Sequence, residues 1–373
     1  MSSRIALSEP FLGGNERRYL DECVTTNFVS SVGPFVDRFE REFAAYVGAR
    51  YAVACASGTA ALHVAFRLID LQPGDEVLVP SLTFIASVNP IAYERATPVL
   101  VDSELETWNI DPALVVEHIE GRARSGQRMP KAVEVVHLLG HPAKIEPIAD
   151  VCDKYGIALI EDAAEALGAR YRGGRFDGRH VGTIGRIGCF SFNGNKIMTT
   201  GGGGMITTDD PELARRAKHL TTQARLPGLA YRHDEVGYNY RLTNVAAALG
   251  VAQLEQLPAF IAKKQQIAER YDAALGGIDG VVLPPRAAWA SPSCWLYSLR
   301  TPRRDPWLER LIAESVEARP IWTAVHGMPM YRTAPRIGGE RAEQLAAEAL
   351  SIPCSVGLTD EQQGRVIEIL TRG

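Results

Sequence analysis

The chain has 373 residues, of which 46% are hydrophobic and 23% are charged, a composition typical of a globular protein of about two domains with a sizeable core. Its 40 basic and 44 acidic residues give a net charge of −4, which argues against binding nucleic acid or an anionic membrane by bulk charge. No apolar run approaches the ~20 residues of a membrane span, and the start M-S-S-R-I-A-L-S-E-P lacks a signal-peptide pattern, so we expect a cytoplasmic protein that binds no membrane.

The first part of the chain alternates strands and helices. An extended arm over residues 1–12 precedes two segments with helical spacing, 16–26 and 35–47. Short apolar runs then predict strands at 51–55, 76–79, 98–101, 131–136, 157–160 and 187–192, with helices at 58–69, 84–93 and 145–155. This alternation predicts an α/β fold with a mostly parallel central sheet and helices on both faces. In such sheets ligands bind beyond the carboxyl ends of the strands.

The pattern changes after Met205. Helices are expected at 210–220, 243–254 and 258–275, and a segment rich in Gly, Pro and Ala follows at 276–292. We therefore divide the chain into a large domain over 1–275, which includes the arm, and a smaller α+β lobe over 276–373. The lobe is expected to hold a strand at 295–300 and helices at 307–318 and 340–350.

Metal and disulfide sites have little support. The six cysteines lie far apart and form no C-x-x-C pair, which favours free thiols. His137 and His141 stand in the segment H-L-L-G-H without an accompanying carboxylate or cysteine cluster, so we interpret them as turn residues and expect no metal.

Lys196 stands at the end of a polar turn that follows the apolar run starting at Ile187. Four glycines, 201–204, come soon after it. An amine between apolar flanks is desolvated, which lowers its pKa and suits it to carbonyl chemistry, and glycines leave room for a flat ligand. Taken alone, the segment also fits a solvated lysine in a loop.

Two further segments follow strands. Ser57, Gly58 and Thr59 begin a helix, where free N–H groups bind anions, although the same residues suit an ordinary helix cap. Phe84 follows the next strand and has the ring needed to stack on a planar ligand, although an aromatic residue at this spacing also suits a core position.

The strand at 157–160 leads into a pair of carboxylates. Asp162 would lie at the carboxyl edge of the sheet, where a charge requires a partner such as a pyridinium N–H. Glu165 follows three residues later. The alternative for Asp162 is a helix cap.

These segments fit one cofactor when they are taken together. A phosphate cradle, a ring stacker, an acid for a pyridine nitrogen and a lysine occur in this order at strand ends, as pyridoxal 5′-phosphate bound through a Schiff base requires. The chain has no G-x-G-x-x-G after a strand, no Walker lysine, no H-E-x-x-H and no G-x-S-x-G.

The motifs resemble those of the DegT/DnrJ/EryC1/StrS family of pyridoxal-phosphate sugar aminotransferases, a branch of the fold-type I (aspartate aminotransferase-like) enzymes. The resemblance covers nearly the whole chain and rests on E-D-A-A-E-A-L-G-A, F-S-F-N-G-N-K, T-T-G-G-G-G-M and G-Y-N-Y-R-L-T-N. The N-G-N-K form, with T-T-Q-A and H-D-E-V-G-Y-N-Y-R, is most similar to enzymes that aminate C4 of nucleotide-linked 4-keto-6-deoxy sugars, of the legionaminic-acid, bacillosamine and perosamine types.

The resemblance implies roles at the cofactor. Lys196 forms the internal aldimine, and Asp162 pairs with the pyridine nitrogen. Phe84 stacks on the ring. The residues implied to hold the phosphate are Gly58, Thr59 and Ser191, with Ser57 beside them.

The resemblance implies further roles that are less closely tied to the motifs. Glu165 lies near the ring hydroxyl, where many relatives have Gln. Asn239 reaches the phosphate of the neighbouring subunit, which implies a homodimer with shared active sites. Arg241 and His326 are expected to bind substrate.

The implied reaction is a ping-pong transfer of an amino group from L-glutamate to a nucleotide-linked keto-sugar, most similar to transfer to C4. Alternatives are amination at C3 or of a keto-cyclitol, a sugar dehydratase of the same family, and a regulator that kept the fold. The dehydratases typically carry histidine where this chain has Lys196, and a regulator has no need of the Schiff-base amine.

Overall fold

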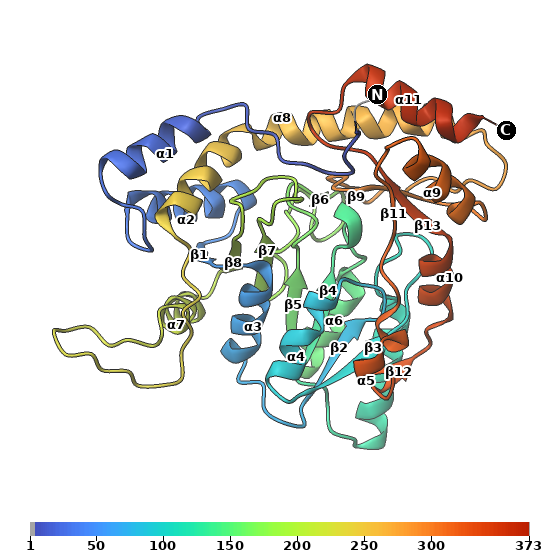
Figure 1. Ribbon diagram of the computed structural model, residues 1–373. Coiled ribbons are helices and arrows are strands. Elements are labelled where there is room, and N and C mark those ends of the chain that lie inside the picture. Colours follow the sequence, from blue (N-terminus) through green and yellow to red (C-terminus); the bar gives the residue numbers. More distant parts are fainter. Residues whose placement is uncertain (1–3, 373) are drawn as a thin grey trace.

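The centre of the computed structural model, which describes residues 4–372, is an eight-stranded sheet with the order β1-β8-β7-β5-β4-β2-β3-β12 (Figure 1). Its strands are β1 (Tyr51–Cys55), β2 (Glu76–Pro80), β3 (Thr97–Val101), β4 (Ala132–Val136), β5 (Ala158–Asp162), β7 (Ile187–Ser191), β8 (Gly204–Thr208) and β12 (Arg336–Ile337). Only β8 runs against its neighbours. The predicted α/β fold with a mostly parallel sheet is confirmed.

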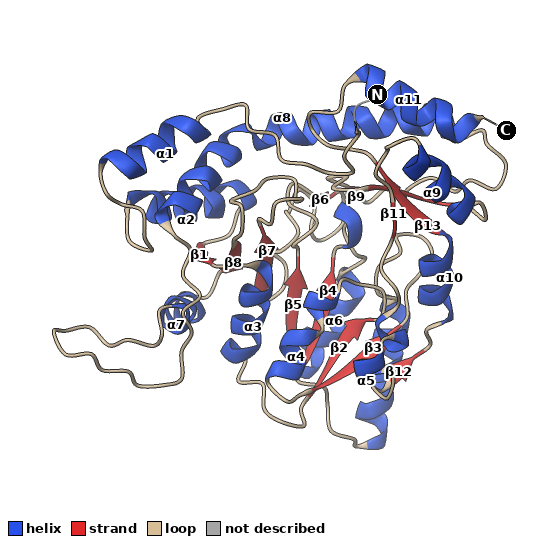
Figure 2. Cartoon of the chain, viewed as in Figure 1, coloured by secondary structure: helices blue, strands red, loops and turns tan. Residues whose placement is uncertain are grey.

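Helices cover both faces of this sheet (Figure 2). One face packs on α3 (Gly58–Leu68), α4 (Asn89–Tyr93) and α7 (Pro211–Thr221). The other packs on α2 (Pro34–Val47), α5 (Pro112–Ser125) and α6 (Glu146–Tyr155), with α1 (Glu16–Thr25) further out. Each face has its own apolar cluster, so strand side chains of both orientations are buried, as is typical of parallel sheets.

The C-terminal part forms a smaller antiparallel sheet in the order β10-β13-β11. Its elements are β10 (Tyr297–Arg300), α9 (Arg304–Ala313), β11 (Arg319–Pro320), α10 (Glu340–Glu348), β13 (Ala349–Ile352) and α11 (Asp360–Thr371). The short strands β6 (Arg170–Tyr171) and β9 (Ala290–Ser291) pair with each other. The 3₁₀ turns are η1 (Ile85–Ser87), η2 (Leu138–Gly140), η3 (Val325–Gly327) and η4 (Pro329–Tyr331). The division at residue 275 stays a prediction, and β12 from this part pairs with β3 of the large sheet.

The two helices predicted over 243–275 are one continuous helix, α8 (Asn244–Leu275), with Pro258 inside it. The prediction was wrong because proline removes one helix hydrogen bond, whereas Leu254, Leu257 and Phe260 are buried on both sides of it and hold the helix in place. By length and hydropathy α8 is also apolar enough to cross a membrane, but half of that stretch is buried in the protein. It packs on α1, α2 and α11, as a core helix does.

Other boundaries also differ from the prediction. The helix expected at 84–93 is the short turn η1 followed by α4. The helix expected at 340–350 ends at Glu348, and β13 begins at the next residue, Ala349. The sequence prediction missed two helices that begin with side-chain caps. Asp111 accepts a hydrogen bond from the Ala113 N–H at the start of α5, and Thr359 forms a capping box with Gln362 at the start of α11.

Candidate active site

A cavity of about 430 Å³ opens at the carboxyl ends of β5 and β7. Eight of the residues predicted to bind the cofactor line it: Ser57, Gly58, Thr59, Phe84, Asp162, Glu165, Ser191 and Lys196. They come from four separate stretches of the sequence, which the fold brings together at the edge where α/β sheets bind ligands.

Lys196 projects from the turn after β7, which is closed by a hydrogen bond from its backbone N–H to the Asn193 carbonyl (3.0 Å). Its side chain is 14% exposed, and Nζ lies 3.9 Å from Glu165 Oε1. Nζ also lies 3.7 Å from the ring centre of Trp295. Burial lowers the pKa of this amine, while Glu165 and Asp162 partly oppose the shift. A neutral amine is therefore more accessible here than on the surface.

Asp162 ends β5 and is buried. One carboxylate oxygen accepts a hydrogen bond from the Ala164 N–H (3.0 Å), and the other accepts one from the Ser87 hydroxyl (2.8 Å). Burial raises its pKa, opposed by these two donors and by Lys196. The carboxylate thus retains acceptor capacity toward the cavity, because each oxygen has a second lone pair.

Glu165 is buried in the same wall. Its Oε2 accepts a hydrogen bond from the Leu139 N–H (2.8 Å), and its Oε1 faces Lys196. Burial raises the pKa of this carboxyl to about 7, and the Lys196 charge opposes the shift. The protonation state of Glu165 beside Lys196 therefore changes with pH near neutrality.

The start of α3 forms one end of the cavity. The Ser57 hydroxyl accepts a hydrogen bond from the Ala60 N–H (3.1 Å), so it caps the helix as the simpler interpretation expects. The first N–H groups of the helix have no partner within it and carry the positive end of its dipole. A Cβ on Gly58 would lie 2.7 Å from the Ser191 Cβ, so only glycine allows this close approach of α3 and β7. Ser57 can therefore cap α3 while other N–H groups at the start of this helix remain able to bind an anion.

Aromatic rings form a further part of the cavity lining. Phe84 is 49% exposed, and its ring lies 6.4 Å from that of Trp322. Trp322 stacks on Trp295 at 6.3 Å, with a 15° angle between the rings. Trp295, Trp322 and Ser87 were not predicted, because no local pattern in the sequence links them to Lys196 or Asp162.

Three predicted residues lie outside the lining of this cavity. Asn239 is exposed and accepts a hydrogen bond from Arg241 (3.3 Å), which is half-buried. His326 is buried, with Nδ1 2.5 Å from the Ser81 hydroxyl and Nε2 2.8 Å from Glu343. Their proposed roles at the substrate or in a neighbouring subunit stay predictions.

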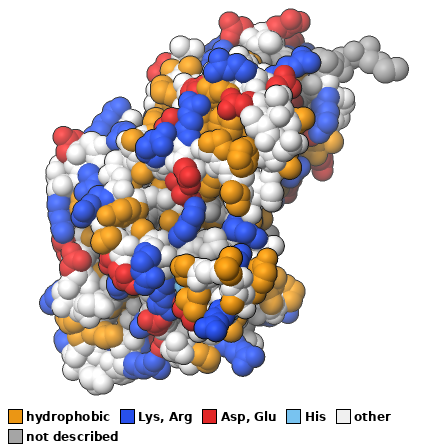
Figure 3. Space-filling view, turned by 90° about the vertical axis from the view of Figure 1, so that its left-hand side faces the viewer, with side chains coloured by type: hydrophobic (Ala, Val, Ile, Leu, Met, Phe, Trp, Pro, Cys, Tyr) orange, Lys and Arg blue, Asp and Glu red, His pale blue; other side chains and the backbone are white. Residues whose placement is uncertain are grey.

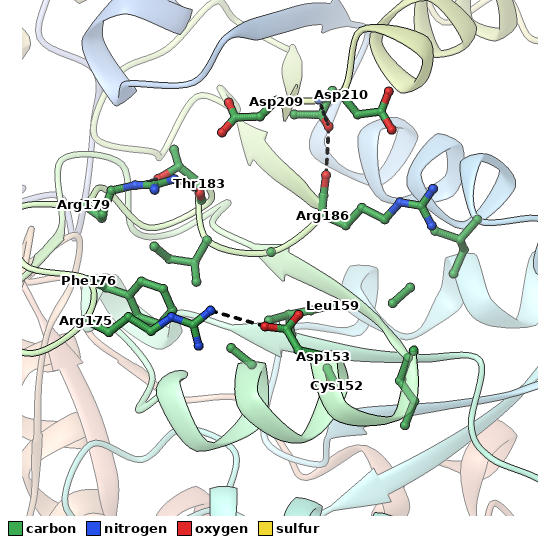
Figure 4. A pocket seen from close by; sticks show the side chains of 18 of the residues that line it. Cys152, Asp153, Leu159, Arg175, Phe176, Arg179, Thr183, Arg186, Asp209 and Asp210 are labelled. Atoms are coloured by element: carbon green, nitrogen blue, oxygen red, sulfur yellow. Dashed lines mark hydrogen bonds and ion pairs between the residues drawn. The ribbon is translucent and has the colours of Figure 1, made fainter.

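A larger hollow of about 910 Å³ lies at the opposite end of β5 and β7, beside Leu159 and Arg186 (Figure 4). Its Arg175 pairs with Asp150 and Asp153, which occupies the guanidinium. The hollow lacks the combination of a desolvated amine and buried acids that the smaller cavity has. Size alone therefore does not identify the reactive site.

The two histidines of H-L-L-G-H have separate protein partners. His137 Nε2 lies 2.9 Å from the buried Glu161 carboxylate, and its Nδ1 accepts from the Ala143 N–H (3.1 Å). His141 lies between the Pro142 carbonyl and the Ala287 N–H. Within residues 4–372, no group of three His, Cys, Asp or Glu residues is arranged to hold a metal ion.

The residues of the smaller cavity fit pyridoxal phosphate. The start of α3 suits the phosphate, Asp162 suits the ring nitrogen, and Lys196 suits the aldehyde carbon. Gly202 lines the cavity, and a Cβ there would meet no atom within 4 Å, which leaves open space for a ring.

Comparison with known proteins agrees with this fit. The sequence profile of the DegT/DnrJ/EryC1/StrS aminotransferase family matches residues 10–371. EpsN of Bacillus subtilis (strain 168) is 42% identical, over 99% of this chain and 96% of that protein. Its name describes it as a putative pyridoxal phosphate-dependent aminotransferase. GDP-perosamine synthase of Caulobacter vibrioides is 40% identical, over 98% and 97%. A dTDP-3-amino-3,4,6-trideoxy-alpha-D-glucose transaminase of Streptomyces venezuelae is 37% identical, over 90% and 86%.

Solved structures share the fold. The aminotransferase TlmJ from Streptoalloteichus hindustanus superposes with a TM-score of 0.90 at 31% identity, over 99% of this chain and 98% of that chain. DesV of S. venezuelae superposes with a TM-score of 0.87 at 34% identity, over 95% and 93%. The aspartate aminotransferase-like fold predicted from the motifs is confirmed.

Proposed function

This chain belongs to the DegT/DnrJ/EryC1/StrS family of pyridoxal phosphate-dependent sugar aminotransferases, and from that premise we propose that it moves an amino group from L-glutamate to C4 of a nucleotide-linked 4-keto-6-deoxy sugar. It is a transaminase that acts on nucleotide sugars. The assignment of C4 rests on the N-G-N-K motif and on the similarity to GDP-perosamine synthase. The choice of L-glutamate as the amino donor rests on membership of the family.

The observation that carries the proposal is the position of Lys196, whose amine is buried between Trp295 and Glu165 in the same cavity as Asp162. Pyridoxal phosphate supplies an aldehyde that takes up amines and a ring that accepts electrons from the substrate carbon. Lys196 would hold the cofactor through its aldehyde carbon. Once freed by the donor amine, its Nζ would carry a proton between the substrate carbon and the former aldehyde carbon, as its lowered pKa permits.

The other residues of the cavity would position the cofactor and polarise its ring. Asp162 presents a carboxylate to the ring nitrogen, and its bond from Ser87 fixes its orientation. Glu165, on the same side of the cavity as the amine, is placed to accept a hydrogen bond from the ring hydroxyl or to exchange a proton with Lys196. Phe84 lines the cavity and would stack on the cofactor ring.

Amination at C3 is the second candidate. The observation that favours it is the 37% identity to the dTDP-3-amino sugar transaminase. A dehydratase is a weaker candidate because Lys196 is intact.

We also propose a homodimer whose sites are shared. Asn239 is exposed and lies outside this chain's own cavity, as a residue that serves a neighbouring subunit would. The side of the molecule with α1, α2 and α7 carries exposed apolar side chains among charged ones (Figure 3). The exposed large apolar residues in the segments after α1 and α7 are Phe28, Val29, Val32, Leu229, Tyr231 and Val236. Mixing Lys196→Ala and Asn239→Ala variants should restore activity through hybrid dimers, in which one site keeps both residues; no restoration would contradict a shared site.

Absorption spectroscopy tests the reaction. Purified protein with pyridoxal phosphate should show a visible band that L-glutamate removes and one keto-sugar nucleotide from a GDP-, UDP- and dTDP-linked panel restores. NMR of the product identifies the aminated carbon. Lys196→Ala is the matched control and should show neither change. A band that ignores glutamate would contradict the donor, and a product aminated at C3 would replace the C4 assignment.

A further inference from the structure

Trp295, just before β10, is held by hydrogen bonds on both its backbone and its side chain, and it is buried. Its carbonyl oxygen accepts a hydrogen bond from Nζ of Lys264 (2.7 Å), a buried lysine of α8. Its indole Nε1–H donates to the carbonyl of Asn195 (2.7 Å), the residue directly before Lys196. Trp295 therefore links the C-terminal part of the chain to the turn that carries the amine.

The backbone that holds Trp295 is strained, and the lysine bonded to it is costly to bury. Cys294, directly before Trp295, has a φ of 54°, in the left-handed region that residues other than glycine rarely adopt. The Lys264 ammonium has the Trp295 carbonyl and the Cys354 sulfur (3.6 Å) as partners, and a buried charge costs free energy even when it is hydrogen-bonded. Features of this kind cluster at functional sites, where the surrounding structure maintains them.

The ring face of Trp295 is turned to the Lys196 amine. Nζ lies 3.7 Å from the ring centre, well within the ~6 Å over which an aromatic face attracts a cation. The nearly parallel ring of Trp322 packs against Trp295 and restricts its tilt. This attraction is strongest where water is excluded, as it is around the buried Lys196 side chain.

The other charged groups that line the cavity are Glu165, Asp162 and Arg319. Glu165 lies closest to Nζ among the two acids that act on it, and Asp162 acts more weakly. Both acids attract the ammonium form of Lys196, but a carboxylate can also take up its proton. The face of an aromatic ring attracts the ammonium without offering a lone pair for the proton. Trp295 can therefore hold the amine without competing for its proton.

We propose that Trp295 is a positioning residue for Lys196: its indole N–H fixes the turn that carries the lysine, and its ring face holds the side-chain ammonium beside Glu165. The inference rests on Lys196 as the cofactor lysine of the proposed function, and not on the identity of the sugar or of the amino donor. Lysine has a flexible four-carbon stem, and a reacting group is effective only when it is held within reach of the reacting atom.

The first test weakens the ring face while it keeps the size of the side chain. Mono-, di- and trifluorinated tryptophan, placed at position 295 of the full-length chain, withdraw electrons from the ring progressively and retain the N–H. The pKa of Lys196 is measured in the apoprotein from the pH dependence of its acetylation by acetic anhydride, followed by mass spectrometry. This pKa should fall with each added fluorine, by about 0.5–1 pH unit over the series, because a weaker attraction disfavours the ammonium form.

The matched control is the same fluorinated series at Trp289, which lies outside the lining of the cavity and should leave the pKa of Lys196 unchanged. A pKa that is equally unchanged by fluorination at Trp295 would overturn the proposal. Because these side chains keep the shape of tryptophan, this test does not require a cavity-forming variant to fold.

The second test removes the indole N–H. Trp295→Phe keeps an aromatic face, and amide hydrogen exchange of Lys196, whose N–H closes the turn on Asn193, should become about five- to tenfold faster, as expected for the loss of one hydrogen bond. Ser8→Ala is the matched control, because the Ser8 hydroxyl donates to the same Asn195 carbonyl (2.9 Å) from an exposed position, and it should change the exchange less. Equal exchange rates in Trp295→Phe and the native protein would overturn the proposal.

Neither measurement uses the cofactor or a sugar. A protein that gives both expected results but forms no visible band with pyridoxal phosphate would contradict the proposed function, whereas the placement of the amine by Trp295 would stand. A protein that forms the band and transfers amino groups, but gives neither expected result, would overturn this inference and leave the proposed function intact.

Discussion

Two consecutive carboxylates of β5, Glu161 and Asp162, are both buried and point to opposite faces of the sheet. Glu161 accepts hydrogen bonds from the N–H groups of Gly182, Ile184 and Gly185 and from His137. These donors outweigh burial and hold the pKa of Glu161 below its ordinary value. Asp162 has two protein donors, and its pKa is raised.

The difference separates a structural charge from a functional one. The bonding capacity of Glu161 is met within the protein, so the residue ties the 182–185 loop to β5 and has nothing left for a ligand. Asp162, Glu165 and Lys196 line one cavity, and burial shifts their pKa values further than their protein partners shift them back. A bound group is therefore needed to pair their charges. The comparison predicts that substitutions on one face change chemistry and substitutions on the other change stability.

The largest effect on the cavity face is expected from Lys196→Ala. Turnover should fall at least ~10⁴-fold, because one amine serves as both anchor and proton carrier. Steady-state transamination measures the loss, and circular dichroism should show an unchanged fold. Lys144→Ala, at an exposed lysine, is the matched control and should behave like the native protein. Appreciable turnover by Lys196→Ala would remove the basis of the assignment.

Asp162→Asn should lower turnover by roughly 10²–10³-fold, because the amide cannot hold the proton on the ring nitrogen electrostatically. Its thermal midpoint should stay within a few degrees of the native one, since the Asn oxygen still accepts the bond from the Ala164 N–H and the Ser87 hydroxyl can turn to accept a bond from the Asn NH₂ group. Kinetics and differential scanning calorimetry on the same preparation check both parts. A large drop in stability with normal kinetics would reverse the roles assigned to the two faces.

Glu161→Gln should show the opposite pattern. The free energy of unfolding should fall by about 3–4 kcal/mol, because an amide NH₂ group faces backbone donors that the carboxylate oxygens satisfied. The turnover of the folded fraction should change little. Urea denaturation with paired kinetic assays measures the two quantities, and an unchanged denaturation midpoint would contradict the structural role of Glu161.

Glu165→Gln should change the pH dependence of apoprotein stability. The folded-state pKa of about 7 lies above the ordinary value of 4.5. Between these two pH values the folded protein therefore binds more protons than the unfolded chain. Native stability should therefore fall as pH rises from about 5 to about 7, by about 2–3 kcal/mol relative to Glu165→Gln. Urea denaturation at pH 5, 6, 7 and 8 tests this, and parallel curves for the two proteins would refute it.

Glu134→Met should raise the free energy of unfolding by about 1–2 kcal/mol, the smallest effect in the series, because it removes a buried polar group that has no partner. Chemical denaturation measures the gain. Destabilisation instead would mean that Glu134 makes a favourable contact in the folded state.

Much of the fold follows from local patterns. The strands that carry the site were predicted within two residues of their observed ends, because short apolar runs bounded by turn residues have few alternatives. Asp162 was identified because it closely follows such a run, and Lys196 because it ends the polar turn after one and precedes four glycines. The prediction divided α8 at Pro258 because proline has a low helix propensity. In the structure, buried side chains on both sides of the proline hold one continuous helix.

By itself, therefore, the sequence determined which groups stand at the strand ends and which cofactor they suit, because those properties depend on neighbours along the chain. Only the tertiary structure decided which distant groups surround them. Trp295 contacts the Lys196 amine from the C-terminal part of the chain, and Glu134 lies beneath Asp162 through the parallel register of β4 and β5. The physical reason is that pKa values and cavity shape depend on burial and on charges across the sheet, which adjacent residues in the sequence do not specify.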